Sequence, residues 1–215
     1  AGNWEHTNIL HTPQSTAVIA QTLGVSESEL LLIIQNCNAV LMLERNKRVR
    51  PQTDDKQLLG WNALMNTALS KAFAATGNKN YLIRAQKNMA HLFACFKNSK
   101  GDGWLHTYKN GYAKTPAFLD DYAYLIEALI QLQTVSGDFH WLEKAGEITD
   151  YVNDHFMESN TGFYFYTHDA QTDVILRKKE VYDGATPSGN AVMASNLFHL
   201  GVVYGSDKYL SLSKQ

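Results

Sequence analysis

The sequence predicts an all-α fold made of repeated helical hairpins, and three observations support this prediction. Residues 122–132 are apolar on nearly every side, with only Glu127 and Gln131 as polar exceptions, which is typical of a helix buried in a larger assembly. After a Ser-Gly turn, apolar residues recur at helical spacing over residues 139–156, which predicts an amphipathic second helix. The same succession of buried helix, turn and second helix occurs in two further places.

The repeat is visible from matching positions along the chain. The buried segments begin at Trp61, Asp121 and Gly189. Each reaches its turn the same number of residues later, at Thr76, Ser136 and Tyr204. A long period of about 60 to 70 residues, made of paired helices with an inner and an outer face, predicts a solenoid or a closed ring of hairpins.

The first part of the chain has a different character. Residues 1–24 are polar and irregular, and we interpret them as a linker segment with at most a short helix over residues 16–22. Ser26 followed by Glu29 has the spacing of a capping box, and the pattern after it predicts a helix over residues 30–45. We therefore expect the helical domain to cover residues 25–215, with three hairpins of which the third is truncated.

Short β-hairpins are expected after each outer helix. Residues 104–108 have the composition of a strand, and Asn110-Gly111 is a strong signal for a tight hairpin turn. The aromatic run 163–166 is expected to pair with residues 174–177 in a second hairpin. These insertions are expected on the functional rim of the helical domain.

Composition excludes several classes of function. The net charge is −2 and there is no run of Lys or Arg, which argues against nucleic acid or an anionic membrane as partner. No segment approaches the roughly 20 apolar residues of a membrane span. Cys37 and Cys95 are expected to be buried free thiols. The eight histidines show no pair at metal-ligand spacing, so the sequence predicts no metal site and no cofactor.

Three polar loops lead into the three buried helices, and in a ring of hairpins they would meet at one end of the central cavity. They cover residues 54–56, 118–122 and 182–190. The acid/base candidates in and beside these loops are Asp55, Asp120, Asp121 and Asp183. The candidates for contacts with substrate are Trp61, Asn62, Tyr122, Ser188 and Asn190. Carboxylates, amides and aromatic rings together are typical of a carbohydrate site.

The same residues have a purely structural interpretation. Asp and Ser just before a helix commonly act as N-caps, which stabilise the helix by about 0.5–2 kcal/mol and do nothing else. The adjacent pair Asp120 and Asp121 weakens this interpretation slightly, because one cap needs only one carboxylate.

These loops also carry a resemblance to a known family. The run from Phe118 to Ala123, the run from Tyr182 to Asn190, and Asp54-Asp55-Lys56 with the segment after Trp61 resemble the YyaL-type proteins, bacterial relatives of the animal spermatogenesis-associated thioredoxin-like protein. The resemblance covers nearly the whole chain. It implies a thioredoxin-like N-terminal domain joined to an (α/α)6 toroid of the six-hairpin glycosidase type, similar also to the N-acylglucosamine 2-epimerases.

The fold class expected is therefore all-α, part of an (α/α)6 toroid with short β-hairpin insertions. The thioredoxin-like part is absent and only about half a toroid is present, so we expect a fragment of a longer, cytoplasmic protein. Residues 191–203 should then expose an apolar flank and drive self-association. The function expected is that of a carbohydrate-active domain, either hydrolase or epimerase-like. The alternatives are a non-catalytic sugar- or peptide-binding module and a scaffold attached to a redox domain.

Overall fold

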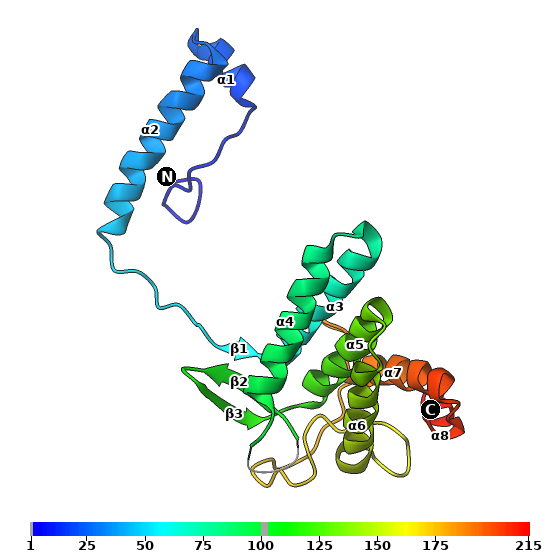
Figure 1. Cartoon of the computed structure of the whole chain (residues 1–215). Helices are drawn as coiled ribbons and strands as arrows, with labels where there is room; N and C mark the ends of the chain where they lie inside the picture. The colour runs from blue at the N-terminus through cyan, green and yellow to red at the C-terminus, as the bar shows by residue number, and fades with distance from the viewer. Residues whose placement is uncertain (1, 100–102) are drawn as a thin grey trace. The chain divides into compact units, whose positions relative to one another are not determined.

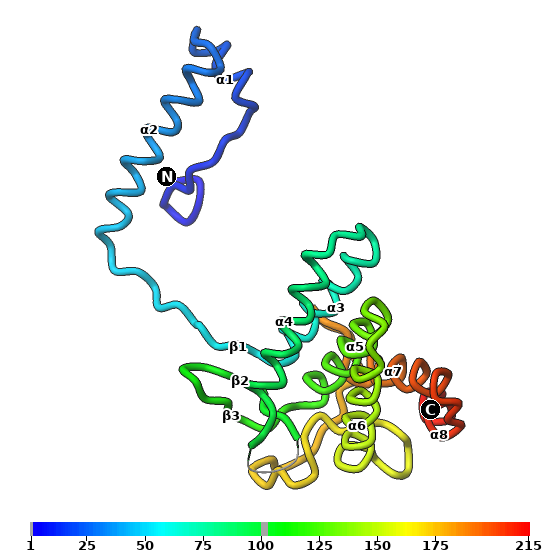
Figure 2. The backbone as a smooth tube through the Cα atoms, in the orientation of Figure 1, coloured from blue at the N-terminus to red at the C-terminus, as the bar shows by residue number. Residues whose placement is uncertain are grey.

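The computed structural model describes residues 2–99 and 103–215, and the chain divides into two compact units, Ala1–Asp54 and Asp55–Gln215. The elements of both units are labelled in Figure 1, and Figure 2 traces the backbone alone. The division follows residue 54, so the helix predicted over residues 30–45 lies in the first unit and not with the hairpins.

The first unit holds α1 (Thr16–Leu23) and α2 (Glu27–Asn46), which confirms both helices predicted for this region. Ser26 caps α2 by accepting a hydrogen bond of 3.2 Å from the Glu29 N–H. Apolar side chains of α2 such as Leu32 and Leu43 are exposed within this unit. Cys37 is also exposed, so the prediction that it is buried is wrong, because no other element among the described residues of this unit covers that part of α2.

The second unit is built from antiparallel helical hairpins, as predicted. Their helices are α3 (Leu59–Thr76) with α4 (Lys79–Phe96), α5 (Leu119–Ser136) with α6 (Phe139–Phe156), and α7 (Gly189–Tyr204) with α8 (Asp207–Leu212). The first helix of each pair ends at a glycine with positive φ: Gly77 at 68°, Gly137 at 72° and Gly205 at 63°. Glycine adopts this left-handed conformation without the steric cost of a Cβ, which explains the recurrent Gly at each turn.

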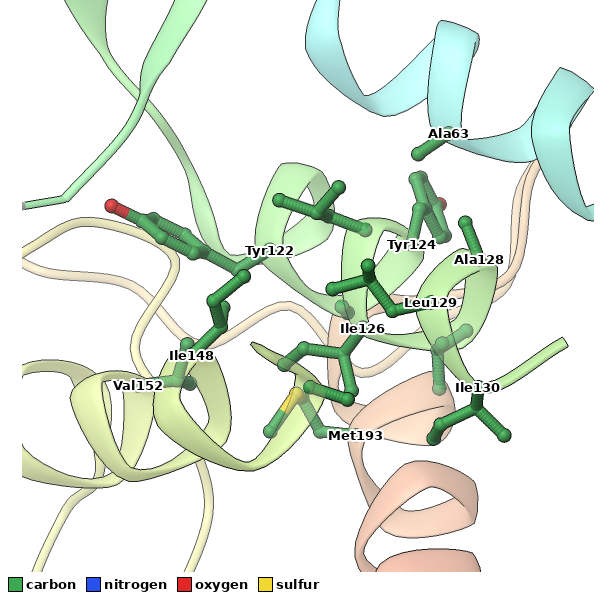
Figure 3. Packing of buried hydrophobic residues seen from close by; sticks show 14 of the residues in the cluster. Ala63, Tyr122, Tyr124, Ile126, Ala128, Leu129, Ile130, Ile148, Val152 and Met193 are labelled. Atoms are coloured by element: carbon green, nitrogen blue, oxygen red, sulfur yellow. The ribbon is translucent and has the colours of Figure 1, made fainter. Parts of the chain in front are cut away.

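The core of the second unit is centred on α5, which packs against α3, α6 and α7. Leu125, Ile126 and Leu129 are fully buried. Figure 3 shows side chains of α5 pointing toward Ala63 of α3, Ile148 of α6 and Met193 of α7. Each such side chain contributes about 1.5–3 kcal/mol on burial. The prediction that this helix is buried on nearly every side is therefore confirmed.

One face of α7 remains uncovered. Phe198, Val202 and Val203 are between 48% and 58% exposed, which confirms the predicted apolar flank. Whether this flank drives self-association stays a prediction.

A small antiparallel sheet joins the start of α3 to the first insertion. Its strands are β1 (Gln57–Leu58), β2 (Leu105–Lys109) and β3 (Tyr112–Pro116), in the order β1-β2-β3. Thr107 pairs with Lys114, and the turn residues Asn110 and Gly111 have φ of 53° and 81°. Positive φ at both central positions is the geometry of a type I′ turn, so the first predicted hairpin is confirmed.

The second predicted hairpin, residues 163–166 with residues 174–177, is wrong. In these two segments, both within the described residues, only Tyr164 forms a bridge, and its partner is Met157. Arg177 instead donates from its side chain to the Thr167 carbonyl, and its guanidinium lies 4.2 Å from the centre of the Phe165 ring. The segment runs as an irregular loop, and the Arg177 side chain holds it at the Thr167 carbonyl.

No single helix among the described residues is long and apolar enough to cross a membrane. Only α1 and α2 taken together pass that test, and they are bent by 101° at their junction.

Candidate functional site

The starts of α3, α5 and α7 approach one another closely around the first turn of α5. Gly60 of α3 donates its N–H to Asp121 Oδ1 at 2.8 Å, and a Cβ at position 60 would lie 2.9 Å from that oxygen. Gly189 of α7 makes a similar approach, because a Cβ there would lie 2.9 Å from Leu119 Cγ. Two glycines therefore allow the two neighbouring helices to reach the start of α5.

The Asp121 carboxylate connects these elements from a buried position. The residue is 2% exposed. Oδ1 accepts from Gly60, and Oδ2 accepts from the Phe118 N–H at 3.0 Å and from His106 Nδ1 at 2.7 Å. The hydrogen bond to Asp121 raises the pKa of His106, and the partial burial of the ring opposes this rise without cancelling it. Asp121 thus joins α3, β2 and the start of its own helix through three hydrogen bonds.

Asp120, the preceding residue, faces a cavity of about 180 Å³. The polar and aromatic residues that line the cavity with Asp120 are Tyr124, Tyr166, Glu180, Tyr182, Thr186 and Ser188. The rest of the lining comes from Leu119, Gly184, Pro187 and Gly189. Asp120 Oδ1 accepts from the Asp121 N–H at 3.0 Å. Burial, and next the charge of Asp121, raises the pKa of Asp120 from 3.8 to about 6. A carboxyl group with that pKa can give or take a proton near neutral pH.

The loop before α7 forms one wall of this cavity. Asp183 Oδ1 accepts from the Ser188 N–H at 2.8 Å, and Ser188 Oγ accepts from the Ala191 N–H at 3.2 Å as the N-cap of α7. Tyr124 of α5 donates its hydroxyl hydrogen to the Pro187 carbonyl. Asp183 and Ser188 therefore shape the loop, and Ser188 also lines the cavity.

The two asparagines predicted as substrate contacts lie in the framework around the site. Asn190 accepts from the Tyr164 N–H at 2.8 Å and donates to the carbonyls of Tyr164 and Glu180. Asn62 donates at 2.8 Å to the carbonyl of Leu58, the residue that precedes its helix. Asn190 thereby fixes the backbone on either side of the irregular loop that carries Tyr166 and Glu180.

The remaining candidates occupy three different settings. Tyr122 is 2% exposed, and its hydroxyl accepts from the Trp104 N–H at 2.9 Å, so it belongs to the core. Trp61 is 70% exposed on α3. Asp55 is exposed and pairs with Lys109 at the end of the sheet, and that hydrogen bond lowers its pKa. Of the predicted residues, Asp120 and Ser188 line the cavity itself.

The sequence analysis missed further residues of the site, among them His106, Tyr166 and Glu180. His106 lies on β2, fifteen residues before its carboxylate partner. Tyr166 lies in the segment that was expected to form a hairpin, and Glu180 follows that segment. The Tyr166 carbonyl accepts from the Leu119 N–H at 2.9 Å, and its ring stacks on Phe118 at 4.9 Å. The aromatic run at residues 163–166 was noticed in the sequence, but nothing in it indicated contact with the start of α5.

Comparison with known proteins adds relatives along the whole chain. No family model matches it. An uncharacterized protein of Caenorhabditis elegans is 30% identical over 221 residues, which is all of this chain and 30% of the relative. Spermatogenesis-associated protein 20 is 26% identical in Rattus norvegicus and 28% in Homo sapiens, covering 97% and 93% of this chain. The chain spans less than a third of the length of these relatives, at 30%, 28% and 26%.

Several solved structures with a similar fold are sugar enzymes. An α-mannanase of Bacteroides thetaiotaomicron has a TM-score of 0.62 at 18% identity, covering 93% of this chain and 55% of its own. A cellobiose 2-epimerase of Spirochaeta thermophila has a TM-score of 0.60 at 19% identity, and the match covers 76% of this chain and 43% of the epimerase. An inactive α-1,6-mannanase of Salegentibacter, in complex with α-1,6-mannotriose, has a TM-score of 0.59 at 14% identity, covering 73% and 44%.

These likenesses establish the fold class. The second unit is part of an (α/α)6 toroid of the six-hairpin glycosidase type, mostly helical and with a short β-hairpin insertion. The relatives also bear out the resemblance to spermatogenesis-associated proteins. The expected thioredoxin-like domain, the fragment and the cytoplasmic location stay predictions.

Proposed function

We propose that the protein catalyses an acid–base reaction on a carbohydrate, either hydrolysis of a glycosidic bond or epimerisation, with Asp120 as the acid/base group. The observation that carries this proposal is a carboxyl group with a pKa of about 6 that faces a cavity lined by tyrosines, hydroxyl groups and a second carboxylate. Tyrosine rings stack on sugar rings, and hydroxyls and carboxylates bind sugar hydroxyls. The composition therefore fits a sugar better than an apolar ligand.

In hydrolysis, protonated Asp120 donates its proton to the glycosidic oxygen as the bond from that oxygen to the anomeric carbon breaks. Water then adds to the anomeric carbon, and Glu180, the other carboxylate of the cavity, accepts the proton of that water. Positioned acid–base groups of this kind contribute about 10²–10⁴-fold to a rate. The raised pKa of Asp120 supplies the protonated acid that the first step needs.

Asp121 acts as a positioning residue in this proposal. Both of its oxygens accept hydrogen bonds from the protein, so it holds the start of α5 against α3 and β2. Its charge also contributes to the raised pKa of Asp120. Asp183, Ser188 and Asn190 hold the cavity wall, and the exposed ring of Trp61 is a further candidate for contact with a sugar.

The sugar enzymes of similar fold support a role for the aspartate pair. The inactive Salegentibacter mannanase variants that were solved with α-1,6-mannotriose and α-1,6-mannotetrose each have two consecutive aspartates replaced, by asparagine in one and by alanine in the other. This chain carries consecutive aspartates at the start of a central helix. Mannose oligosaccharides are therefore the first substrates to test.

The size of the cavity limits what this chain binds. A volume of about 180 Å³ is below the roughly 300–1,000 Å³ of pockets for drug-sized ligands. We expect this cavity to hold a single sugar ring. Because the chain covers about half or less of the sugar enzymes compared, further walls of a complete site would come from residues outside it.

The decisive experiment measures turnover and binding of this chain on a panel of α-linked mannose oligosaccharides and cellobiose. Wild type is compared with Asp120→Asn and with Asp138→Asn as matched control. Asp138 caps α6 at the opposite end of the same hairpin, so its change tests capping alone. Loss of turnover in Asp120→Asn only, with binding kept, supports the proposal. Sugar binding without turnover in wild type would favour the non-catalytic binding module.

A further inference from the structure

We infer that His155, His168 and Asp169 form a binding site for a divalent transition-metal ion such as Zn²⁺. His155 lies in the last turn of α6, and His168 and Asp169 lie on the irregular loop that follows. One ligand atom from each residue lies within 4.8 Å of the others. None of the three lines the Asp120 cavity, so this inference does not depend on the proposed function.

The spacing of the ligand atoms is close to that of a metal centre. Asp169 Oδ1 lies 2.9 Å from His168 Nδ1 and 3.2 Å from His155 Nδ1. Ligands at about 2.0–2.1 Å from a tetrahedral Zn²⁺ are roughly 3.3 Å apart. The two imidazole rings are stacked, with centroids 4.5 Å apart and an interplanar angle of 20°. Because the lone pairs lie in the ring planes, the rings would rotate out of this stack to direct both nitrogens at one ion beside the carboxylate.

Two of the three ligand atoms face each other at hydrogen-bonding distance. His168 Nδ1 accepts a hydrogen bond of 2.9 Å from the Ala170 N–H, so this nitrogen presents a lone pair and not a hydrogen. Asp169 Oδ1, at 2.9 Å from the same nitrogen, is also an acceptor. A cation between these two atoms, either a proton or a metal ion, relieves their mutual repulsion. A metal ion would take the place of the Ala170 N–H as the partner of His168 Nδ1. Ala170 is exposed, so its N–H can then donate to solvent water.

The donor set and its exposure indicate the class of ion. Two imidazoles and one carboxylate suit Zn²⁺, Co²⁺, Ni²⁺ and Cu²⁺, whereas Mg²⁺ and Ca²⁺ prefer oxygen ligands alone. The side chains of His155, His168 and Asp169 are 37%, 19% and 48% exposed. Water can therefore complete the coordination of an ion held by three protein ligands.

The backbone already holds the three ligands together. The Asp169 N–H donates to the His155 carbonyl at 3.1 Å. Arg177 donates to the same His155 carbonyl at 3.0 Å and to the Thr167 carbonyl at 2.6 Å, and so fixes the loop to the end of α6. The positive charge of Arg177 opposes a bound cation, so we expect moderate affinity.

Binding would stabilise a wall of the Asp120 cavity. The loop that carries His168 also carries Tyr166 and Glu180, which line that cavity. An ion that bridges this loop to α6 would restrict its motion. Free ion at about 100 times Kd should raise the Tm by about 5 °C or more.

The test is a titration of the EDTA-treated chain with Zn²⁺ by calorimetry and with Co²⁺ by visible absorption. Wild type should bind one ion at this site and develop the d–d bands of Co²⁺ in a site with nitrogen and oxygen ligands. His168→Ala and Asp169→Asn should each weaken binding by about 10- to 100-fold or more, since a direct ligand costs at least as much as an outer-shell partner.

His140→Ala is the matched control, because His140 is an exposed residue at the other end of the same helix. It should bind as wild type does. Melting curves without metal identify any variant that fails to fold, and Asp169→Asn, a nearly isosteric change at a half-exposed side chain, remains interpretable if His168→Ala unfolds. Absence of binding to wild type, or equal affinity in wild type, His168→Ala and Asp169→Asn, would overturn the inference.

Discussion

The starts of α5 and α7 are equivalent positions in the repeat, but they use their polar residues differently. At α7, Ser188 caps the helix, and the Asp183 carboxylate accepts a backbone hydrogen bond that holds the loop. The Asp183 carboxylate therefore has a structural role. At α5 the residue before the helix is Phe118, which offers no side-chain cap, and Asp121 caps the backbone from inside the first turn. Asp120 accepts a hydrogen bond from the Asp121 N–H and faces the cavity. The comparison teaches that capping explains Asp121 and Asp183 better than it explains Asp120.

The largest effect expected from this contrast is on catalysis. Asp120→Asn removes the titratable proton and should lower turnover by about 10²–10⁴-fold, whereas Asp183→Asn should leave turnover within a few fold. Asp120→Asn should not destabilise the fold, because it removes a carboxyl group whose ionisation burial opposes. Steady-state kinetics with melting curves of both variants measure the contrast. Equal losses of turnover in the two variants would contradict the assignment of a catalytic role to Asp120 and a structural role to Asp183.

The next effect is on stability. Asp121→Ala leaves the Gly60 and Phe118 N–H groups and His106 without their acceptor, and each unsatisfied buried group costs about 1–3 kcal/mol. We expect a loss of about 3 kcal/mol or more in the free energy of unfolding. Asp183→Ala removes one hydrogen bond and should cost about 1 kcal/mol. Urea denaturation of both variants gives the comparison, and a smaller loss in Asp121→Ala would contradict it.

The close approach at Gly60 provides a third test. A Cβ there would meet Asp121 Oδ1 at 2.9 Å and Tyr124 Cδ2 at 3.2 Å, so Gly60→Ala should destabilise the fold by about 1–3 kcal/mol through overpacking. Gly184→Ala is the control in the loop before α7, where a Cβ meets nothing within 4 Å. Its effect on the midpoint of chemical denaturation should be small. If both substitutions are neutral, the packing of α3 on α5 is looser than described.

The last effect is the dependence of stability on pH. The pKa of Asp120 is raised in the folded chain from 3.8 to about 6, so between these values the folded chain binds more protons than the unfolded chain. The resulting stabilisation is fully present below about pH 4 and is lost as pH rises through about 6. Asp120→Asn should flatten this part of the profile, as measured by the difference in unfolding free energy at pH 4 and pH 7. An identical profile in the variant would mean that the Asp120 pKa is not raised.

What the sequence by itself determined about this protein is largely local. The glycines at 77, 137 and 205 end helices because left-handed backbone favours glycine, and Asn110-Gly111 turns a hairpin for the same reason. Ser26 caps α2, and continuous apolarity marks α5 as buried. These signals act within one or two turns of chain, so they can be read without knowing what packs where.

Only the tertiary structure decided how the polar residues divide their roles. Consecutive residues on a helix point in directions about 100° apart, but which of Asp120 and Asp121 turns to the cavity depends on the approach of Gly60 and His106 from elsewhere. His155 and His168 stack because an irregular loop folds back on α6, where the sequence indicated strands instead. Arg177 stabilises that loop by binding the carbonyls of Thr167 and His155 with its side chain. Such contacts depend on the three-dimensional path of the chain, and no local pattern of residues encodes them.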